Sequence, residues 1–240
     1  MTATSSLTRS SSTWRGSWPR DWPHPTTVSS ARRFSTMPRQ GAIRLSSGSL
    51  KGKSIRVPEG LTVRPMRTRV REALFNRLQD HLQMGRVLDV FAGSGAVGIE
   101  AVSRGARQTI HVENTREVLP LLRKNLRDLG IEAQCKILER DAYRLGPEPP
   151  GSAFDLILLD PPFPDYRGPQ SKPWILASEL AAGEWLRPGG WLVMEHPSRE
   201  ETAPPPPGIE AREGRRYGDT SLIFWFKSET ASTPEETQES

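Results

Sequence analysis

The chain has 240 residues, a formal net charge of +5 and one cysteine, Cys135. This length allows one main domain with an extension, and a single cysteine excludes an internal disulfide or a cysteine-based metal cluster. No apolar stretch is long enough to cross a bilayer as a helix. We therefore expect a monomer in a reducing compartment, with no bound metal and no membrane contact.

The first 40 residues are predicted to be a disordered basic extension. Residues 1–36 are rich in Ser, Thr, Arg and Pro and carry five arginines against one acid, Asp21. Such a composition without hydrophobic periodicity indicates disorder. It is also typical of an organelle transit peptide, and a further alternative is that translation begins at Met37. We favour a cytoplasmic protein, with an organelle as the alternative location.

Residues 41–83 form a basic segment that is predicted to contain a hairpin and a helix. Residues 42–57 have the pattern of two short strands around a Ser/Gly/Lys turn. Residues 64–82 repeat apolar side chains four positions apart, as an amphipathic helix does. Between residues 37 and 80 the chain has ten Lys and Arg and three acids. This positive field suits a nucleic acid, and a solvated basic face is the ordinary alternative.

Three arginines crowd the first turns of that helix, at Arg67, Arg69 and Arg71. Positive side chains are unfavourable near a helix amino terminus. An external anion is therefore expected for at least some of them.

From residue 84 to residue 227 the expected strands and helices alternate, which implies an α/β fold with a doubly wound, mostly parallel sheet. A final hairpin would place one antiparallel strand at an otherwise parallel edge. The tail, 228–240, is acidic and is predicted to be disordered. The expected strands are 86–91, 108–113, 133–138, 154–159 and 191–195, and the hairpin strands are 211–217 and 221–226. The expected helices are one that begins in the stretch AGSGAVGIEAVSRGA and is closed by Gly105, and those at 115–129 and 174–186.

A glycine loop follows the first of these strands and opens a helix. Gly93, Gly95 and Gly98 match the G-x-G-x-x-G pattern, and Glu113 ends the next strand 20 residues after Gly93. The glycines allow the backbone to approach a ligand closely, and the carboxylate can accept hydrogen bonds from ribose hydroxyls. Both a nicotinamide dinucleotide and S-adenosylmethionine (SAM) fit this pattern.

Acids after the other strands favour SAM. Asp89 lies near the glycine loop, where a carboxylate suits an ammonium or sulfonium and repels a pyrophosphate. Asp141, after the third strand, can accept from an adenine amino group. Asp160 adds a further carboxylate after the fourth strand.

The stretch LILLDPPF, residues 156–163, ends a buried strand in an acid, two prolines and an aromatic ring. The prolines prevent further strand pairing or an immediate helix. Asp160 and the Pro161 carbonyl can each accept an N–H bond of an exocyclic amino group, and Phe163 can stack on the base. The sulfonium methyl group then needs only a nucleophile held in line with it. This corner predicts amino-group methylation on a base that has been splayed into a pocket.

The stretches VLDVFAGSGAVGIEA and LILLDPPF resemble motifs I and IV of class I SAM-dependent methyltransferases. With RPMRTRVREALFN, GAIRLSSGSLKGK and RRYGDTSLIFW, the chain resembles the bacterial RsmD-like 16S rRNA (guanine-N2)-methyltransferases over about residues 41–227. The resemblance implies a Rossmann-like fold with a small N-terminal hairpin and helix. It also implies 16S rRNA as partner, either alone or within a small-subunit assembly intermediate.

The resemblance also implies the roles of individual residues. The cofactor SAM would contact Asp89, Phe91, Gly93, Gly95, Glu113, Asn114, Asp141 and Ala142. The target base would contact Asp160, Pro161, Pro162 and Phe163. RNA would contact Lys51, Lys53, Arg64, Arg67, Arg69 and Arg71.

Three alternatives remain open. The corner after residue 159 serves adenine as well as guanine, so an adenine-N6 nucleic-acid methyltransferase is the first alternative. An NAD-dependent dehydrogenase is the second, although His111 and His196 both have positions typical of structural residues. The third is an RNA-binding module with a relict site, which the intact Asp160, Glu113 and loop glycines disfavour.

Overall fold

The computed structural model describes residues 40–58, 66–78, 81–83, 85–146 and 153–229. All of them lie in one compact unit. The expectations for residues 1–39, for Arg64 and for most of the acidic tail fall outside this part of the chain. No helix in the described ranges is long and apolar enough to cross a membrane.

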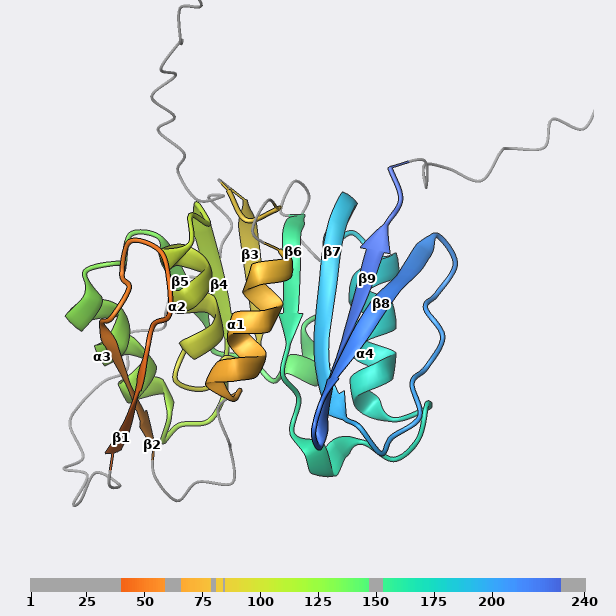
Figure 1. Cartoon of the computed structure of the whole chain (residues 1–240), viewed down its shortest axis with the longest axis horizontal. Coiled ribbons are helices and arrows are strands. Elements are labelled where there is room, and N and C mark those ends of the chain that lie inside the picture. The colour runs from red at the N-terminus through yellow and green to blue at the C-terminus, as the bar shows by residue number, and fades with distance from the viewer. Residues whose placement is uncertain (1–39, 59–65, 79–80, 84, 147–152, 230–240) are drawn as a thin grey trace, which may run out of the picture. The chain divides into compact units, whose positions relative to one another are not determined.

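The centre of the molecule is a seven-stranded sheet with the order β5-β4-β3-β6-β7-β9-β8 (Figure 1). Strands β3 to β7 pair in parallel, and β9 is antiparallel to both of its neighbours. This confirms the doubly wound, mostly parallel sheet with a C-terminal hairpin. The antiparallel strand lies second from the edge, however, because β9 inserts between β7 and β8. The strands are β3 (Arg86–Val90), β4 (Gln108–Val112), β5 (Cys135–Leu138), β6 (Phe154–Leu159), β7 (Leu186–Pro197), β8 (Ile209–Tyr217) and β9 (Thr220–Lys227).

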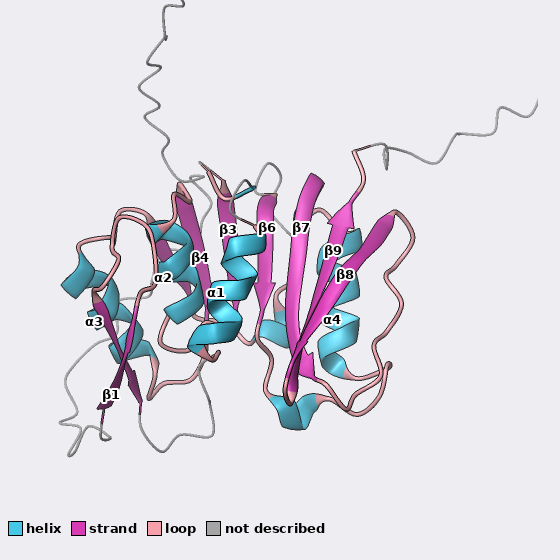
Figure 2. Ribbon diagram, in the orientation of Figure 1, coloured by secondary structure: helices cyan, strands magenta, loops and turns pink. Residues whose placement is uncertain are grey.

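Helices cover both faces of the sheet (Figure 2). One face carries α1 (Thr68–Arg77) and α2 (Ala96–Ser103), and the opposite face carries α4 (Lys172–Ala182). The helix α3 (Leu119–Leu129) packs beside α2. Because side chains alternate along a strand, Leu156 and Leu158 of β6 face α1.

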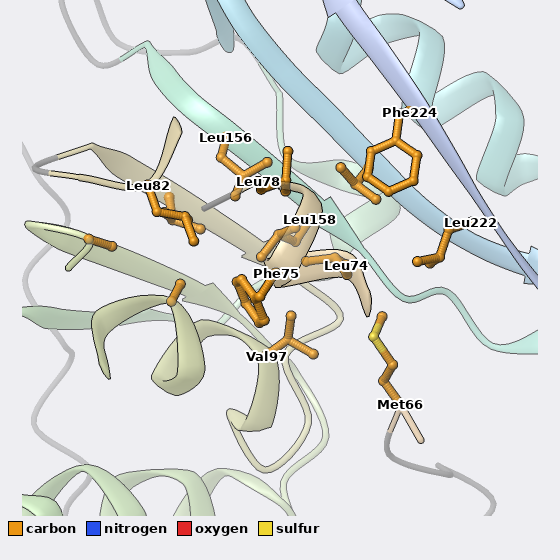
Figure 3. Close-up of a cluster of buried hydrophobic side chains, with 14 of the residues drawn as sticks. Met66, Leu74, Phe75, Leu78, Leu82, Val97, Leu156, Leu158, Leu222 and Phe224 are labelled. Atoms are coloured by element: carbon orange, nitrogen blue, oxygen red, sulfur yellow. The ribbon is translucent and has the colours of Figure 1, made fainter. Parts of the chain in front are cut away.

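The helix α1 belongs to the main core. Its buried side chains Val70, Leu74 and Phe75, with Leu78 directly after the helix, share one cluster with residues of β6, β7 and β9 (Figure 3). The side chains on either side of the expected domain boundary between residues 83 and 84 therefore pack in one continuous core.

A separate two-stranded hairpin, β1 (Gln40–Arg44) with β2 (Ser54–Pro58), confirms the expected N-terminal hairpin. Its connecting loop is held by Glu100 of α2, which is completely buried. The Glu100 carboxylate accepts from the Ser46 hydroxyl at 2.7 Å, the Ser46 amide at 3.0 Å and the Ser47 amide at 3.2 Å. Arg104 donates to the same carboxylate at 3.0 Å. We call this group of contacts the Glu100 clamp.

Several element boundaries differ from those expected. The helix α1 ends at Arg77, α3 begins at Leu119, and α4 spans residues 172–182. Strand β7 is the largest difference, since it begins at Leu186, the last residue of the expected helix 174–186, and includes Pro188 and the two glycines that follow it. Leu186 pairs with Phe154, and a register irregularity follows; such a bulge tolerates a proline.

Candidate active site

A cavity of about 530 Å³ opens at the carboxyl ends of the central strands. After β3 the chain moves outward to β4 and β5, and then returns to β6 on the other side of β3. This reversal is the topological switch point, where open α/β sheets bind their ligands. The cavity volume is typical of a small-molecule site.

The glycine loop forms one wall of the cavity. Phe91 has φ of 66°, an unusual value for a residue other than glycine,. Gly95, with φ of 85°, precedes the first turn of α2, and a Cβ there would lie 2.5 Å from Leu122 Cδ1. The Gly93 amide donates to Glu113 Oε2 at 2.8 Å. The loop is therefore tied to the acid that ends the next strand.

Glu113 is buried and lines the cavity. Its Oε1 accepts from the amides of Asn114 at 2.9 Å and Thr115 at 2.7 Å. Its Oε2 accepts from the Gly93 amide, and a carboxylate oxygen has the capacity for a further hydrogen bond.

Asp141 and two aromatic rings form the next wall. Asp141 accepts from the Tyr143 amide at 3.0 Å and fixes a short 3-10 turn over Ala142–Arg144. The Tyr143 and Phe91 rings lie 5.2 Å apart, and the Tyr143 hydroxyl donates to Asp165 at 2.8 Å. Burial and the Asp165 carboxylate raise the pKa of Tyr143 well above its ordinary value. The phenol is therefore a neutral donor.

The corner after β6 forms a further wall of the cavity. The Asp160 amide donates to the Val90 carbonyl at 3.3 Å, which holds the corner beside β3. A 3-10 turn over Phe163–Asp165 follows directly. The Phe163 ring lies edge-on to Tyr166, with 6.5 Å between the ring centroids. The ring is half-buried and lines the cavity.

Strand register places a second carboxyl group beside Asp160. Leu159 of β6 pairs with Met194 of β7, so the next residues along the two parallel strands are Asp160 and Glu195. Glu195 is 5% exposed and also lines the cavity. Its Oε2 has no hydrogen-bond partner among the described residues.

The two carboxyl groups favour a shared proton. Desolvation raises the pKa of Asp160 well above its ordinary value, and the charges of Glu195 and Asp89 act in the same direction. Desolvation also raises the pKa of Glu195, while Thr220 and Arg67 oppose that change. The proximity of the two carboxyl groups raises the pKa of Asp160 further and partly offsets the rise for Glu195. Because both pKa values are raised, the pair retains a proton to higher pH than an exposed carboxyl group would.

Most residues expected at the site are brought together by the fold. Those that line the cavity are Phe91, Gly93, Glu113, Asn114, Asp141, Ala142, Asp160, Pro161, Pro162 and Phe163.

Two of the residues expected to bind the cofactor do not line the cavity. Asp89 is 2% exposed, and its Oδ2 accepts from the Gly98 amide at 2.9 Å and contacts His111 Nδ1 at 3.0 Å. The expected contact of Asp89 with an ammonium or sulfonium is therefore corrected to a structural role under α2. Gly95 is the N-cap residue of α2 and does not line the cavity.

The expected RNA-binding arginines have different environments. Arg71 is completely buried, lies 3.7 Å from Glu100 and donates to the Arg44 carbonyl at 3.0 Å, so its expected RNA contact is wrong. Arg67 forms a two-pronged ion pair with Asp219 at 2.8 and 2.9 Å on the cavity rim. Lys51, Lys53 and Arg69 are exposed, as an RNA surface would require.

Sequence reasoning missed several residues of the cavity. Tyr143, Asp165, Glu195, Asp219 and Thr220 all line it. Glu195 had a sequence signal, because it is an acid at the end of the apolar run WLVM. Tyr143, Asp165 and Asp219 lie in turns, and Thr220 is the first residue of β9, so none of them carries such a pattern.

The strand order and the position of the cavity define a class I methyltransferase. A family model described as "Conserved hypothetical protein 95" matches residues 43–226. The chain belongs to this family, and it is an RsmD-like methyltransferase. This family membership sets aside the dehydrogenase interpretation of the glycine loop.

Individual relatives agree with this assignment. The chain is 31% identical to the ribosomal RNA small subunit methyltransferase D of Haemophilus influenzae, over 68% of this chain and 83% of the relative. It is 37% identical to the Escherichia coli protein of the same name, over 51% of this chain and 61% of the relative.

Solved structures show the same fold. The structure of YhhF from Escherichia coli has a TM-score of 0.68 at 29% identity, covering 79% of this chain and all of that one. The Thermus thermophilus 16S rRNA N2 G1207 methyltransferase, solved with AdoMet and guanosine, has a TM-score of 0.61 at 20% identity. It covers 83% of this chain and 53% of that one.

Proposed function

We propose that this protein transfers a methyl group from SAM to the exocyclic N2 amino group of a guanine in 16S rRNA. One observation carries the proposal, namely that a single cavity contains both Glu113 with the glycine loop and the Asp160–Phe163 corner. A nucleoside cofactor and a target base can therefore meet there. The relatives named as small-subunit rRNA methyltransferases support RNA as the substrate.

The cofactor would occupy the part of the cavity between the glycine loop and Asp141. Glu113 Oε2 would accept from a ribose hydroxyl, and Gly93 allows close approach of the backbone,. Asp141 and Ala142 would lie at the adenine edge. SAM supplies an electrophilic methyl group on a sulfonium, and the acids of this cavity suit its positive charge.

The target base would enter beside Phe163. Asp160 would accept through a carboxyl oxygen, and the Pro161 carbonyl is a second acceptor. Together they would hold the two N–H bonds of the guanine amino group, with the nitrogen lone pair directed at the methyl carbon.

The bond from sulfur to the methyl carbon would break as the bond from nitrogen to that carbon forms. The products would be S-adenosylhomocysteine and a methylated amino group, which would then release its extra proton to water. Positive charge grows on nitrogen in the transition state, so both hydrogen bonds strengthen there. Excluding water and aligning the two groups supply the remaining acceleration.

RNA would be recognised outside the cavity. Lys51 and Lys53 lie in the turn of the β1–β2 hairpin, and Arg69 lies on α1, all exposed. Such side chains suit phosphate contacts. We place the protein in the cytoplasm as a monomer acting on 16S rRNA, free or within a small-subunit assembly intermediate.

Two measurements test the proposal. Calorimetry should detect SAM binding, and a protein that binds NAD while ignoring SAM would refute it. Tritiated-methyl transfer to rRNA that lacks the modification, followed by nucleoside analysis, should yield N2-methylguanosine. A yield of N6-methyladenosine would instead establish the adenine alternative.

A further inference from the structure

Glu195 is a cavity residue to which the proposed reaction gives no contact with the base. Its side chain is buried to 5% exposure at the carboxyl end of β7, and it lines the cavity. Its Oε2 has no hydrogen-bond partner among the described residues. A buried acceptor without a partner costs free energy, and a donor on a ligand would recover that cost.

The surroundings hold this carboxyl group in place. The Tyr166 hydroxyl donates to the Glu195 backbone carbonyl at 2.6 Å. Thr220 and Asp160 lie beside the Glu195 side chain, close enough to shift its pKa. The β6–β7 register brings Glu195 and Asp160 to the same face at neighbouring strand ends. The cavity thus has two fixed carboxyl groups side by side, and Glu195 Oε2 has no partner among the described residues.

Two adjacent acceptors match guanine and oppose adenine. On guanine, the amino group at C2 stands next to the N1–H bond, so two donors point in the same direction. On adenine, the amino group at C6 stands next to N1, which has no proton and is itself an acceptor. A carboxylate facing that nitrogen would leave two acceptors unpaired and repelling each other.

We propose that Glu195 is the specificity residue that selects guanine, by accepting a hydrogen bond from guanine N1–H while Asp160 and the Pro161 carbonyl hold the N2 amino group. This inference rests on the proposed function. The geometry supports it, because Glu195 lines the cavity beside Asp160 and its Oε2 has no hydrogen-bond partner among the described residues. A site that hydrogen-bonds a particular N–H rejects analogues that lack it.

The test uses a base that keeps the amino group at C2 and lacks the proton on N1. An RNA stem-loop containing the guanine that the wild-type protein methylates is compared with the same RNA carrying 2-aminopurine at that position. Wild-type kcat/KM should favour guanine by roughly 10- to 100-fold, the range expected for one hydrogen bond to a charged group. In the Glu195→Gln variant, the side-chain amide can donate an N–H bond to an unprotonated N1. The ratio of kcat/KM for guanine to that for 2-aminopurine should therefore fall toward one.

The ratio of kcat/KM on the guanine RNA to kcat/KM on the 2-aminopurine RNA is compared between the wild-type protein and each variant. This comparison removes the effects of the other differences between the two bases. Glu210→Gln is the matched control, since Glu210 lies on β8, is half-exposed and pairs with Arg212 away from the cavity. It should retain the wild-type preference. Calorimetric SAM binding checks that Glu195→Gln is folded, and Glu195→Asp, which keeps a carboxylate, should still prefer guanine.

The outcomes separate this inference from the proposed function. If the wild-type protein forms no N2-methylguanosine, the proposed function fails. If it does, but methylates both bases equally, Glu195 has no role in selection, whether or not any variant folds. A Glu195→Gln protein that loses activity equally on both bases would likewise overturn the inference and leave the proposed function intact.

Discussion

Asp160 and Glu195 place two carboxyl groups at adjacent strand ends, where their surroundings disfavour charge. Because the folded protein raises both pKa values, it holds a proton that the unfolded chain releases. The stability that this proton contributes is fully present below the ordinary carboxyl pKa of about 4. It is lost as the pH rises through the raised value.

Asp160→Asn removes this titrating group, so the variant does not lose this contribution to stability as the pH rises. The free energy of unfolding of the variant, relative to that of the wild-type protein, should therefore increase with pH. The slope should reach at most about 1.4 kcal/mol per pH unit for one proton. Urea unfolding of both proteins between pH 5 and pH 8 measures it. A difference that stays constant over this range would show that the pair does not share a proton.

Asp160→Ala tests the catalytic role of the same residue. Removing one acceptor for the amino group should lower kcat by roughly 10²- to 10³-fold, as removal of one transition-state hydrogen bond does. SAM affinity measured by calorimetry should remain largely intact, since the proposed partner of Asp160 is the base. An equal loss of SAM affinity would instead place Asp160 in the cofactor site.

At the scale of elements, α1 is attached through a buried ion pair. Arg71 and Glu100 are both completely buried, and Arg71 also donates to the backbone of the hairpin. Arg71→Ala should lower the free energy of unfolding by about 3–5 kcal/mol, because it leaves the Glu100 carboxylate buried with less compensation. Arg69→Ala, on the exposed side of the same helix, should change it by less than about 0.5 kcal/mol. Equal stabilities in denaturant unfolding would contradict this assignment.

The two arginines also show what sequence can and cannot predict. Arg71 lies four residues before Phe75, on the apolar side of α1, so helical spacing alone is a signal that it is buried. Its partner Glu100 belongs to a different helix, and local patterns do not reveal such a contact. The expected RNA contact of Arg71 is wrong for this reason.

The cofactor half of the site is more predictable than the base half. The glycine loop and Glu113 belong to one strand-helix-strand unit with a recognisable sequence pattern, and the structure links them through the Gly93–Glu113 hydrogen bond. Glu195 escapes prediction because its position depends on the register between β6 and β7. The expected role of Asp89 is wrong because its carboxylate is already used by the Gly98 amide and by His111 of the neighbouring strand, and the sequence pattern does not show these contacts.

At the scale of the whole molecule, RNA affinity should depend on the exposed cations rather than on the buried one. Replacing Lys51, Lys53 and Arg69 together by Ala should weaken RNA binding. It should also reduce the slope of log affinity against log salt by about 0.7–0.9 for each phosphate that is no longer neutralised. Titrations at several salt concentrations measure this slope.

A matched triple variant provides the control for that experiment. Arg127, Arg187 and Arg199 also carry positive charge at the surface but lie on α3, β7 and the loop after β7. Their replacement by Ala should leave the salt slope nearly unchanged. If both triple variants lower it equally, the basic hairpin and α1 are not the docking surface.

The Glu100 clamp determines how short a fragment of this chain can be and still fold. A fragment that starts after the hairpin would remove three donors from a completely buried carboxylate. It would also uncover the part of the core that Leu45 and Ile55 fill. The β1–β2 hairpin, which is proposed to bind RNA, is therefore also a structural part of the domain that contains the cavity. The hairpin and this domain cannot be separated by truncation or exchanged independently between relatives.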